Sequence, residues 1–301
     1  MTVAAAQVRR LSATAVEILE SLYQHRLLST AQVHELHTPD TSLRWCQRLL
    51  FDTEQAGLTE SVRRPGGEKL HFLTARGADA VETIPSRGEL RRKLVRREQA
   101  AGPLQQHTLA VNDVGLAFVR NARRHDDDCP PLAWRHEIAH PIGGGAQRGK
   151  GELLIADAVL TYTTVTAGRV TVDYRFIELD RGTMATDALA QKLVRYSRLL
   201  DYRGAKAAPG EQPLWRRHFP VFPHVLVVLA HRPRGQLRRR GHRALALARS
   251  FEGDRLAGLV SCCLLEDLLA DGPEAPIFTP IEDPGSQRAW VRPRDDEEPE
   301  S

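Results

Sequence analysis

Hydrophobic residues recur every three to four positions in three stretches of the first 57 residues, the spacing that places side chains on one face of a helix. These predicted helices cover residues 11–23, 29–38 and 40–57. The segments 58–64 and 68–73 have the composition of two strands on either side of a turn at 65–67, and 75–83 returns to a helical pattern. The N-terminal pattern therefore predicts three helices, a β-hairpin and a fourth helix.

The rest of the chain alternates helical patterns with runs of residue types that are usually buried. Helices are predicted over 104–124, 187–202 and 236–251, and strands over 132–139, 152–162, 170–179, 221–230 and 259–265. The order αβββαβ, followed by a helix and a last strand, is typical of a sheet covered by helices. We therefore expect an α+β or α/β protein with an α/β sandwich in its second half.

A length of 301 residues exceeds the usual size of one domain and favours two. We place a helical domain with a hairpin at 8–84, a basic connecting helix at 85–102, an α/β domain at 103–270 and an extended, disordered tail at 271–301.

The composition argues against several classes of protein. No apolar run approaches the roughly 18 residues that a membrane-spanning helix needs. At the N-terminus the apolar residues precede the charged ones, which is the reverse of a secretory signal. The four cysteines include no CxxC pair, which disfavours a disulfide framework and a cysteine-ligated zinc site. We expect a cytoplasmic protein that does not contact a membrane.

The charge is unevenly distributed along the chain. Five of the 38 acidic residues stand in the run 295–300, so the remaining chain carries 33 acidic residues against 42 basic ones. A basic body favours a polyanionic partner such as DNA or RNA. The alternative is a solubilising tail and a solvated basic surface.

The N-terminal order of elements resembles a winged helix-turn-helix domain. In that arrangement the third helix enters the major groove, and the hairpin, or wing, contacts phosphates or the minor groove. The resemblance implies double-stranded DNA as the partner, with these contacts: Arg44, Gln47 and Arg48 from the helix, and Arg63, Arg64 and Lys69 from the hairpin. The alternatives are that these residues only solvate their elements, or that the domain binds a protein.

The second half resembles the PD-(D/E)xK restriction-endonuclease-like fold at two acidic sites. Asp157 lies on one predicted strand, and Glu178 and Asp180 end the next one. The resemblance implies that Asp157 and Glu178 bind Mg²⁺ and that a lysine stabilises charge on the phosphate. Asp180 stands where the family has that lysine, and Lys192 of the following helix is a candidate replacement. The alternative is that these carboxylates form ordinary surface salt bridges.

The whole chain resembles the replication-relaxation family of actinobacterial plasmids and mobile elements. The strings that carry the resemblance are 107–113 (HTLAVND), 155–160 (IADAVL), 176–183 (FIELDRGT) and 189–196 (LAQKLVRY). The resemblance implies DNA transactions during replication or transfer, with other replication or transfer proteins as partners.

Three further patterns bear on function. The densest basic cluster lies in the predicted helix after residue 230 and includes Arg238, Arg239 and Arg240, which we expect to contact a nucleic-acid backbone. The string 136–140 matches the zinc-protease pattern HExxH, but its strand-like context disfavours zinc binding. The string 144–150 matches GxxxxGK but lacks the following Ser or Thr of a phosphate-binding loop.

The sequence leaves three hypotheses. The first is a DNA-binding protein of a mobile element with a nuclease-like domain. The second is a Mg²⁺-dependent endonuclease or nickase that uses Asp157 and Glu178, with Asp180 and Lys192 as further candidate catalytic residues. The third is a homodimeric transcriptional regulator whose nuclease-like domain is inactive.

Overall fold

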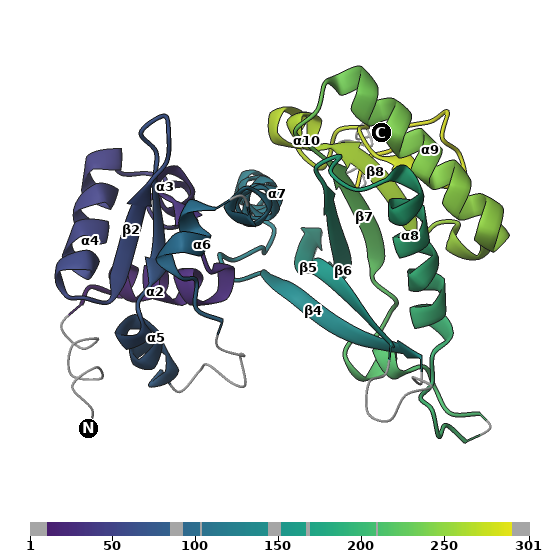
Figure 1. Cartoon of the computed structure of the whole chain (residues 1–301), viewed down its shortest axis with the longest axis horizontal. Helices are drawn as coiled ribbons and strands as arrows, with labels where there is room; N and C mark the ends of the chain where they lie inside the picture. The colour runs from purple at the N-terminus through teal and green to yellow at the C-terminus, as the bar shows by residue number, and fades with distance from the viewer. Residues whose placement is uncertain are drawn as a thin grey trace, which may run out of the picture. The chain divides into compact units, whose positions relative to one another are not determined.

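A computed structural model describes residues 11–84, 93–102, 104–143, 152–166, 169–208 and 210–290. The chain divides into two compact units. Unit 1 extends to Val119 and includes Pro130–Leu132, and unit 2 contains Arg120–Cys129 and the chain from Ala133 onward. The division falls within helix α7 (Leu104–His125), and each unit contains its own sheet (Figure 1).

Unit 1 confirms the predicted order of three helices, a hairpin and a fourth helix. Its elements before α7 are α2 (Ala13–His25), β1 (Leu28–Ser29), α3 (Thr30–His37), α4 (Leu43–Gln55), β2 (Thr59–Arg63), β3 (Lys69–Leu73), α5 (Ala75–Glu82) and the short α6 (Arg97–Ala101). The strand β1 was not predicted, because two residues are too few to show a period. It pairs antiparallel with β3, giving the sheet order β1-β3-β2.

Hydroxyl side chains set where four of these helices begin. The side-chain oxygens of Ser12, Ser29, Ser42 and Thr74 each accept a hydrogen bond from the backbone N–H three residues later, at 3.0–3.3 Å. Such a cap satisfies one of the backbone donors that a helix leaves free at its start. The caps therefore explain why α2, α3, α4 and α5 begin at these points.

The first half of α7 completes the core of unit 1. The buried Gln32 of α3 donates hydrogen bonds to the Leu109 carbonyl (3.0 Å) and to Asp113 Oδ1 (2.7 Å). The buried Asn112 donates to the Leu27 carbonyl at 2.8 Å. Because buried polar groups need such partners, these bonds specify how α7 packs on the helices before it. Of the predicted connecting segment, residues 85–92 lie outside the described part of the chain.

Unit 2 is built on a six-stranded sheet with the order β4-β5-β6-β7-β8-β9. Its elements are β4 (Trp134–Gly143), β5 (Glu152–Thr166), β6 (Arg169–Asp180), α8 (Thr186–Asp201), β7 (His224–Leu229), α9 (Arg234–Glu252), β8 (Val260–Leu264), α10 (Leu265–Asp271) and β9 (Thr279–Pro280), with short 3₁₀ turns at Leu214–Arg217 and Gly253–Leu256. The strands β4, β5 and β6 pair antiparallel, whereas β6, β7 and β8 run parallel. The chain is thus a mixed α+β protein.

The helices α8 and α9 connect the parallel strands, because a parallel pair needs a crossover connection. They lie side by side against the sheet (Figure 1). Their apolar side chains, including Leu193, Tyr196 and Leu245, pack with Phe176 and Val227 of the strands in one core. This packing places the polar residues of α8 next to the ends of β5 and β6.

The chain after 270 differs from the predicted extended tail in its first part. The structure describes residues up to 290, and Ile277, Phe278 and Ile281 are buried. These three apolar side chains anchor the segment, and β9 pairs with β8. The acidic run 295–300 lies outside the described residues. Among the helices that the structure describes, none is long and apolar enough to cross a membrane.

Candidate functional sites

Three of the four predicted catalytic residues lie together in unit 2. The strands β5 and β6 pair through Ala158 and Ile177, which puts Asp157 and Glu178 at neighbouring positions of the two strands. Lys192 reaches them from α8: its Nζ lies 3.4 Å from Asp157 Oδ1 and forms an ion pair with Glu178 Oε2. The ammonium therefore bridges the two carboxylates.

Hydrogen bonds hold both carboxylates in place. Asp157 Oδ2 accepts the backbone N–H of Leu179 at 2.8 Å, and the hydroxyl of Tyr196 donates to Glu178 Oε1. Lys192 and Tyr196 are four residues apart, so they occupy one face of α8. Glu178 is only 2% exposed, whereas Asp157 and Lys192 are 19% and 22% exposed. The site thus opens to solvent at Asp157 and Lys192.

Burial dominates the electrostatics of this site. Burial and the neighbouring Asp157 carboxylate raise the pKa of Glu178 above its ordinary value, against the opposing effect of Lys192. Burial alone would lower the pKa of Lys192, but the carboxylates of Glu178 and Asp157 outweigh it and raise that pKa. Burial and Glu178 also raise the pKa of Tyr196 well above its ordinary value. The Tyr196 hydroxyl is therefore a hydrogen-bond donor at neutral pH.

Asp180, the fourth predicted catalytic residue, has a different partner. Its Oδ2 is paired with Nε of Arg240 from α9, and its Oδ1 accepts the Gly182 N–H at 3.0 Å. The same guanidinium donates to the Met184 carbonyl (2.7 Å) and to Thr186 Oγ1 (3.2 Å). Asp180 and Arg240 thus hold the loop between β6 and α8. The sequence predicted a catalytic role for Asp180 and a DNA contact for Arg240, and it did not predict that these two residues form an ion pair.

The carboxylate pair offers limited metal coordination on its own. Carboxylate oxygens are suitable ligands for Mg²⁺, which typically takes one or two of them together with water and substrate phosphates. Within the described residues, no group of three or more His, Cys, Asp or Glu side chains is placed to hold a metal ion. A cation at Asp157 and Glu178 would therefore need oxygens from a bound ligand or water.

The HExxH string lies in strand β4, as its context predicted. His140 is buried, and its ring lies 5.1 Å from that of Phe176 and 6.0 Å from that of Phe219. Burial and the nearby His218 lower its pKa to about 4, so the imidazole is neutral. A strand does not give the one-face geometry that a zinc protease needs. The GxxxxGK string at 144–150 lies outside the described residues.

The predicted DNA-binding residues of unit 1 lie on α4 and the hairpin. Arg44, Gln47 and Arg48 are exposed, and neither arginine forms an ion pair within the part of the chain that the structure describes. On the hairpin, Arg64 pairs with Glu68 (3.0 Å), Lys69 lies 3.9 Å from Glu54, and Arg63 donates to the Gly67 carbonyl (2.7 Å). The cations of this surface that have no carboxylate partner among the described residues are therefore Arg44 and Arg48 of α4 and Arg63 of the hairpin.

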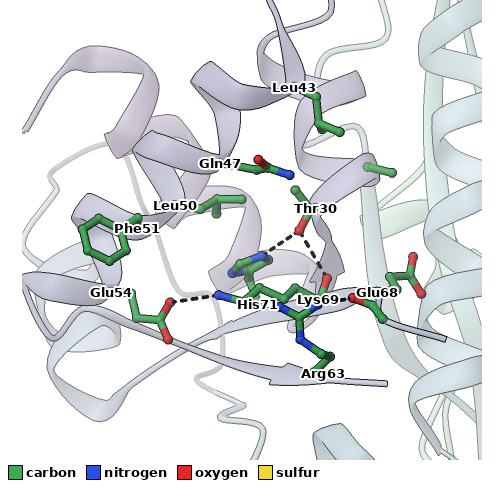
Figure 2. A pocket seen from close by; sticks show the side chains of 12 residues that line it. Thr30, Leu43, Gln47, Leu50, Phe51, Glu54, Arg63, Glu68, Lys69 and His71 are labelled. Carbon is green, nitrogen blue, oxygen red and sulfur yellow. Dashed lines mark hydrogen bonds and ion pairs between the residues drawn. The ribbon is translucent and has the colours of Figure 1, made fainter. Parts of the chain in front are cut away.

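Three apolar residues of α4 are exposed to solvent. They are Leu43 (47%), Trp45 (41%) and Phe51 (56%). A groove of about 470 Å³ runs between α4 and the hairpin, and Leu43 and Phe51 line it together with Gln47 (Figure 2). Sequence reasoning missed this groove, because periodicity does not distinguish a buried helix face from one that lines a cleft.

The basic cluster of α9 is only partly available. Arg234 pairs with Asp267 (2.5 Å) and Glu266 (2.8 Å), and Arg243 lies 3.7 Å from Asp187. Arg238 and Arg239 are exposed, and no ion pair to another described residue involves them. These two arginines are the predicted DNA contacts of α9 that remain free.

Comparison with known proteins gives one match. The model of the replication-relaxation family matches residues 19–213, which include α4, the hairpin, Asp157, Glu178 and Lys192. Searches of curated proteins and of solved structures find no match to the chain.

Proposed function

We propose that this chain, which belongs to the replication-relaxation family, is a DNA-binding protein that acts in the replication or transfer of a mobile element. In this proposal unit 1 is a winged helix that selects the DNA site. Unit 2 is a nuclease-like domain that contacts the DNA backbone. The family indicates a role in replication or in a mobile element, and the DNA contacts are argued from the residues below.

The observation that carries the proposal is the pair of free arginines on α4. Arg44 and Arg48 are one helical turn apart, exposed and without acidic partners among the described residues. Arginine is the side chain that most often pairs with guanine edges in the major groove. The order of helices, with a hairpin after α4, resembles that of a winged helix, in which the corresponding helix enters the groove.

Arg238 and Arg239 support a second, sequence-independent contact. Their charges lie together near the start of α9 and are not neutralised by a described carboxylate. Phosphate contacts of this kind release counterions, so binding through them weakens as salt is raised.

The experiment is a fluorescence-anisotropy titration of the full chain with duplex DNA from its own replicon and with an unrelated duplex, at several salt concentrations. Arg44→Ala and Arg48→Ala should each lower the preference for the specific duplex, with a loss of about 1–3 kcal/mol for a residue that reads a base. Arg238→Ala and Arg239→Ala should weaken binding to both duplexes and reduce the salt slope by about one each.

Two matched controls test whether the effects are local. Arg76→Ala removes an exposed arginine of α5, and Arg249→Ala removes an arginine of α9 that donates to the Glu282 carbonyl. Neither should change the affinity for either duplex. Unchanged affinity in all four test variants would refute the proposed DNA surfaces.

A second candidate function is favoured by the Asp157–Lys192–Glu178 contacts. Two carboxylates from neighbouring strands with a lysine between them fit the requirements of a metal-dependent phosphodiesterase. Asp157 and Glu178 would hold Mg²⁺, which supplies Lewis-acid activation of the phosphate. Lys192 would stabilise negative charge on the phosphate, and Tyr196 would orient Glu178.

Supercoiled plasmid incubated with the protein and Mg²⁺, Mn²⁺ or EDTA tests this second function. Asp157→Asn and Glu178→Gln should both abolish cleavage if the site is catalytic, while Glu152→Gln, at the exposed start of β5, should leave it intact. Intact plasmid that shifts on a gel would favour the DNA-binding function alone. A palindromic footprint with a dimer in sedimentation would favour the regulatory alternative.

A further inference from the structure

The groove of unit 1 has the size of a ligand site. Its volume of about 470 Å³ lies within the range of small-molecule pockets. The helix α4 forms one wall, and residues of β2, β3 and the turn between them form the other (Figure 2). Leu43 and Phe51 lie eight residues apart on α4, so this wall is about 12 Å long.

The wall formed by α4 presents an aromatic ring and an amide. Phe51 is more than half exposed and lines the groove, so one face of its ring is available to a flat partner. Gln47 lies one turn earlier on the same side of the helix, between Leu43 and Phe51 (Figure 2). An amide offers a donor and an acceptor at once, which suits the edge of a nucleobase.

The opposite wall carries both cations and carboxylates. Arg63 and Lys69 line the groove, and each keeps donor capacity beyond its single described contact. Glu68 of the turn lines this wall, Glu54 lines the groove from the end of α4, and carboxylates accept hydrogen bonds from the amino groups of bases. The cations suit a phosphate, while the carboxylates disfavour a ligand that is only anionic.

The buried His71 lines the same groove. His71 Nε2 lies 3.0 Å from Thr30 Oγ1, whose own proton is directed to the Lys69 carbonyl (3.4 Å). Whichever of the two atoms donates, this hydrogen bond uses Nε2 and leaves Nδ1 without a part in it. Nδ1 is buried and has no hydrogen-bond partner in the described residues. Because buried polar atoms are normally paired, this atom indicates a missing hydrogen-bond partner.

We propose that this groove binds one unpaired nucleobase together with its phosphate. The base stacks on Phe51, its edge meets Gln47, and the phosphate lies at Arg63 and Lys69. The inference rests on the proposed function only in that DNA supplies the base. A free nucleotide has the same chemistry and is the second source that the experiment must distinguish.

The test measures binding of the full chain to three probes: the homopolymers dA12, dC12 and dT12 as single strands, the free mononucleotides, and a duplex. Phe51→Ala should weaken single-strand binding roughly five- to hundredfold, the range seen when a stacking aromatic is removed. Phe51→Trp should bind the single strands as the wild type does. Gln47→Ala should change the preference among the three homopolymers. Duplex affinity should change less than threefold in Phe51→Ala.

Trp45→Ala is the matched control, because Trp45 is an exposed aromatic of the same helix that does not line the groove. It should leave single-strand binding unchanged. Competition between a mononucleotide and the single strand would show that the free nucleotide is a ligand in its own right. Without such competition, single-stranded DNA is the source of the bound base.

Three results would overturn the inference: a wild-type protein that binds neither single strands nor mononucleotides, equal binding by wild type and Phe51→Ala, or equal losses for duplex and single strand in that variant. Loss of duplex binding in Arg44→Ala with single-strand binding intact would leave the inference standing. Failure of duplex binding by the wild type would refute the proposed function separately.

Discussion

His140 provides a sharp test of the packing in unit 2, because its pKa is lowered from 6.5 to about 4 by burial among aromatic rings. The change is His140→Phe, which keeps a planar ring and removes the titrating group. The buried Nε2 has no hydrogen-bond partner in the described residues, so the substitution removes no hydrogen bond of that atom. The variant should therefore fold.

The direction of the pH effect on stability follows from comparing how the folded and the unfolded chain bind a proton at His140. Between pH 6.5 and 4 the unfolded chain binds a proton at His140 that the folded chain excludes, so the free energy of unfolding falls as the pH falls. The interval of about 2.5 pH units corresponds to roughly 3 kcal/mol, at about 1.4 kcal/mol per unit. The part of the free energy of unfolding that depends on a neutral His140 is fully present above pH 6.5 and fully lost below pH 4.

Urea unfolding followed by tryptophan fluorescence measures this effect, because Trp134, Trp215 and Trp290 all belong to unit 2. The wild type should lose about 3 kcal/mol more than His140→Phe between pH 7 and pH 4. Groups common to both proteins cancel in the difference. The exposed His242→Phe serves as the control and should leave the profile unchanged.

Parallel profiles for wild type and His140→Phe would refute the reasoning. They would mean that the imidazole of His140 takes up a proton as readily in the folded chain as in the unfolded one. That result would contradict the burial of its ring against Phe176 and Phe219.

Three further predictions concern stability, each measured by thermal or urea unfolding. Gly77→Ala should destabilise unit 1 by about 3 kcal/mol or more, because a Cβ there would lie 1.9 Å from the Leu58 carbonyl oxygen. Arg240→Met should cost about 3–5 kcal/mol by leaving the buried Asp180 unpaired, and a neutral result would contradict that ion pair. Ser42→Ala should cost about 1 kcal/mol through the lost cap of α4, with unchanged stability as the contrary outcome.

Local patterns predicted most of the elements. Helical spacing gave α2, α3 and α4, and the Pro65–Gly67 turn gave the hairpin. The sequence did not predict β1 and β9, since each has two residues and exists only through pairing with another strand. The family resemblance at residues 19–213 was confirmed.

The contacts of the candidate site could be predicted only in part. Lys192 was a candidate replacement for the family's lysine because it lies in the helix after the carboxylates, and the structure places it against both of them. The pairing of Asp180 with Arg240 was not predicted, because these residues are sixty positions apart. The hydrophobic periodicity of a segment carries no information on a contact between the end of a strand and a helix far away in the sequence.

The partners of Glu178 and Asp180 limit what this part of unit 2 can do. Arg240 directs its nitrogens to Asp180, Met184 and Thr186, so its guanidinium is committed to the loop and is a poor candidate for phosphate binding. Lys192 is different, because its ammonium is partly exposed next to the partly exposed Asp157.

A ligand would therefore approach from the side of Asp157 and Lys192, with Glu178 behind them and fixed by Tyr196. This geometry separates two roles within one cluster. In the proposed phosphodiesterase, Asp157 would hold the metal ion together with Glu178 and Lys192 would contact the phosphate, whereas Tyr196 would act through the orientation of Glu178. Changes at Asp157 should consequently affect ligand binding itself, and changes at Tyr196 should act through the position and protonation of Glu178.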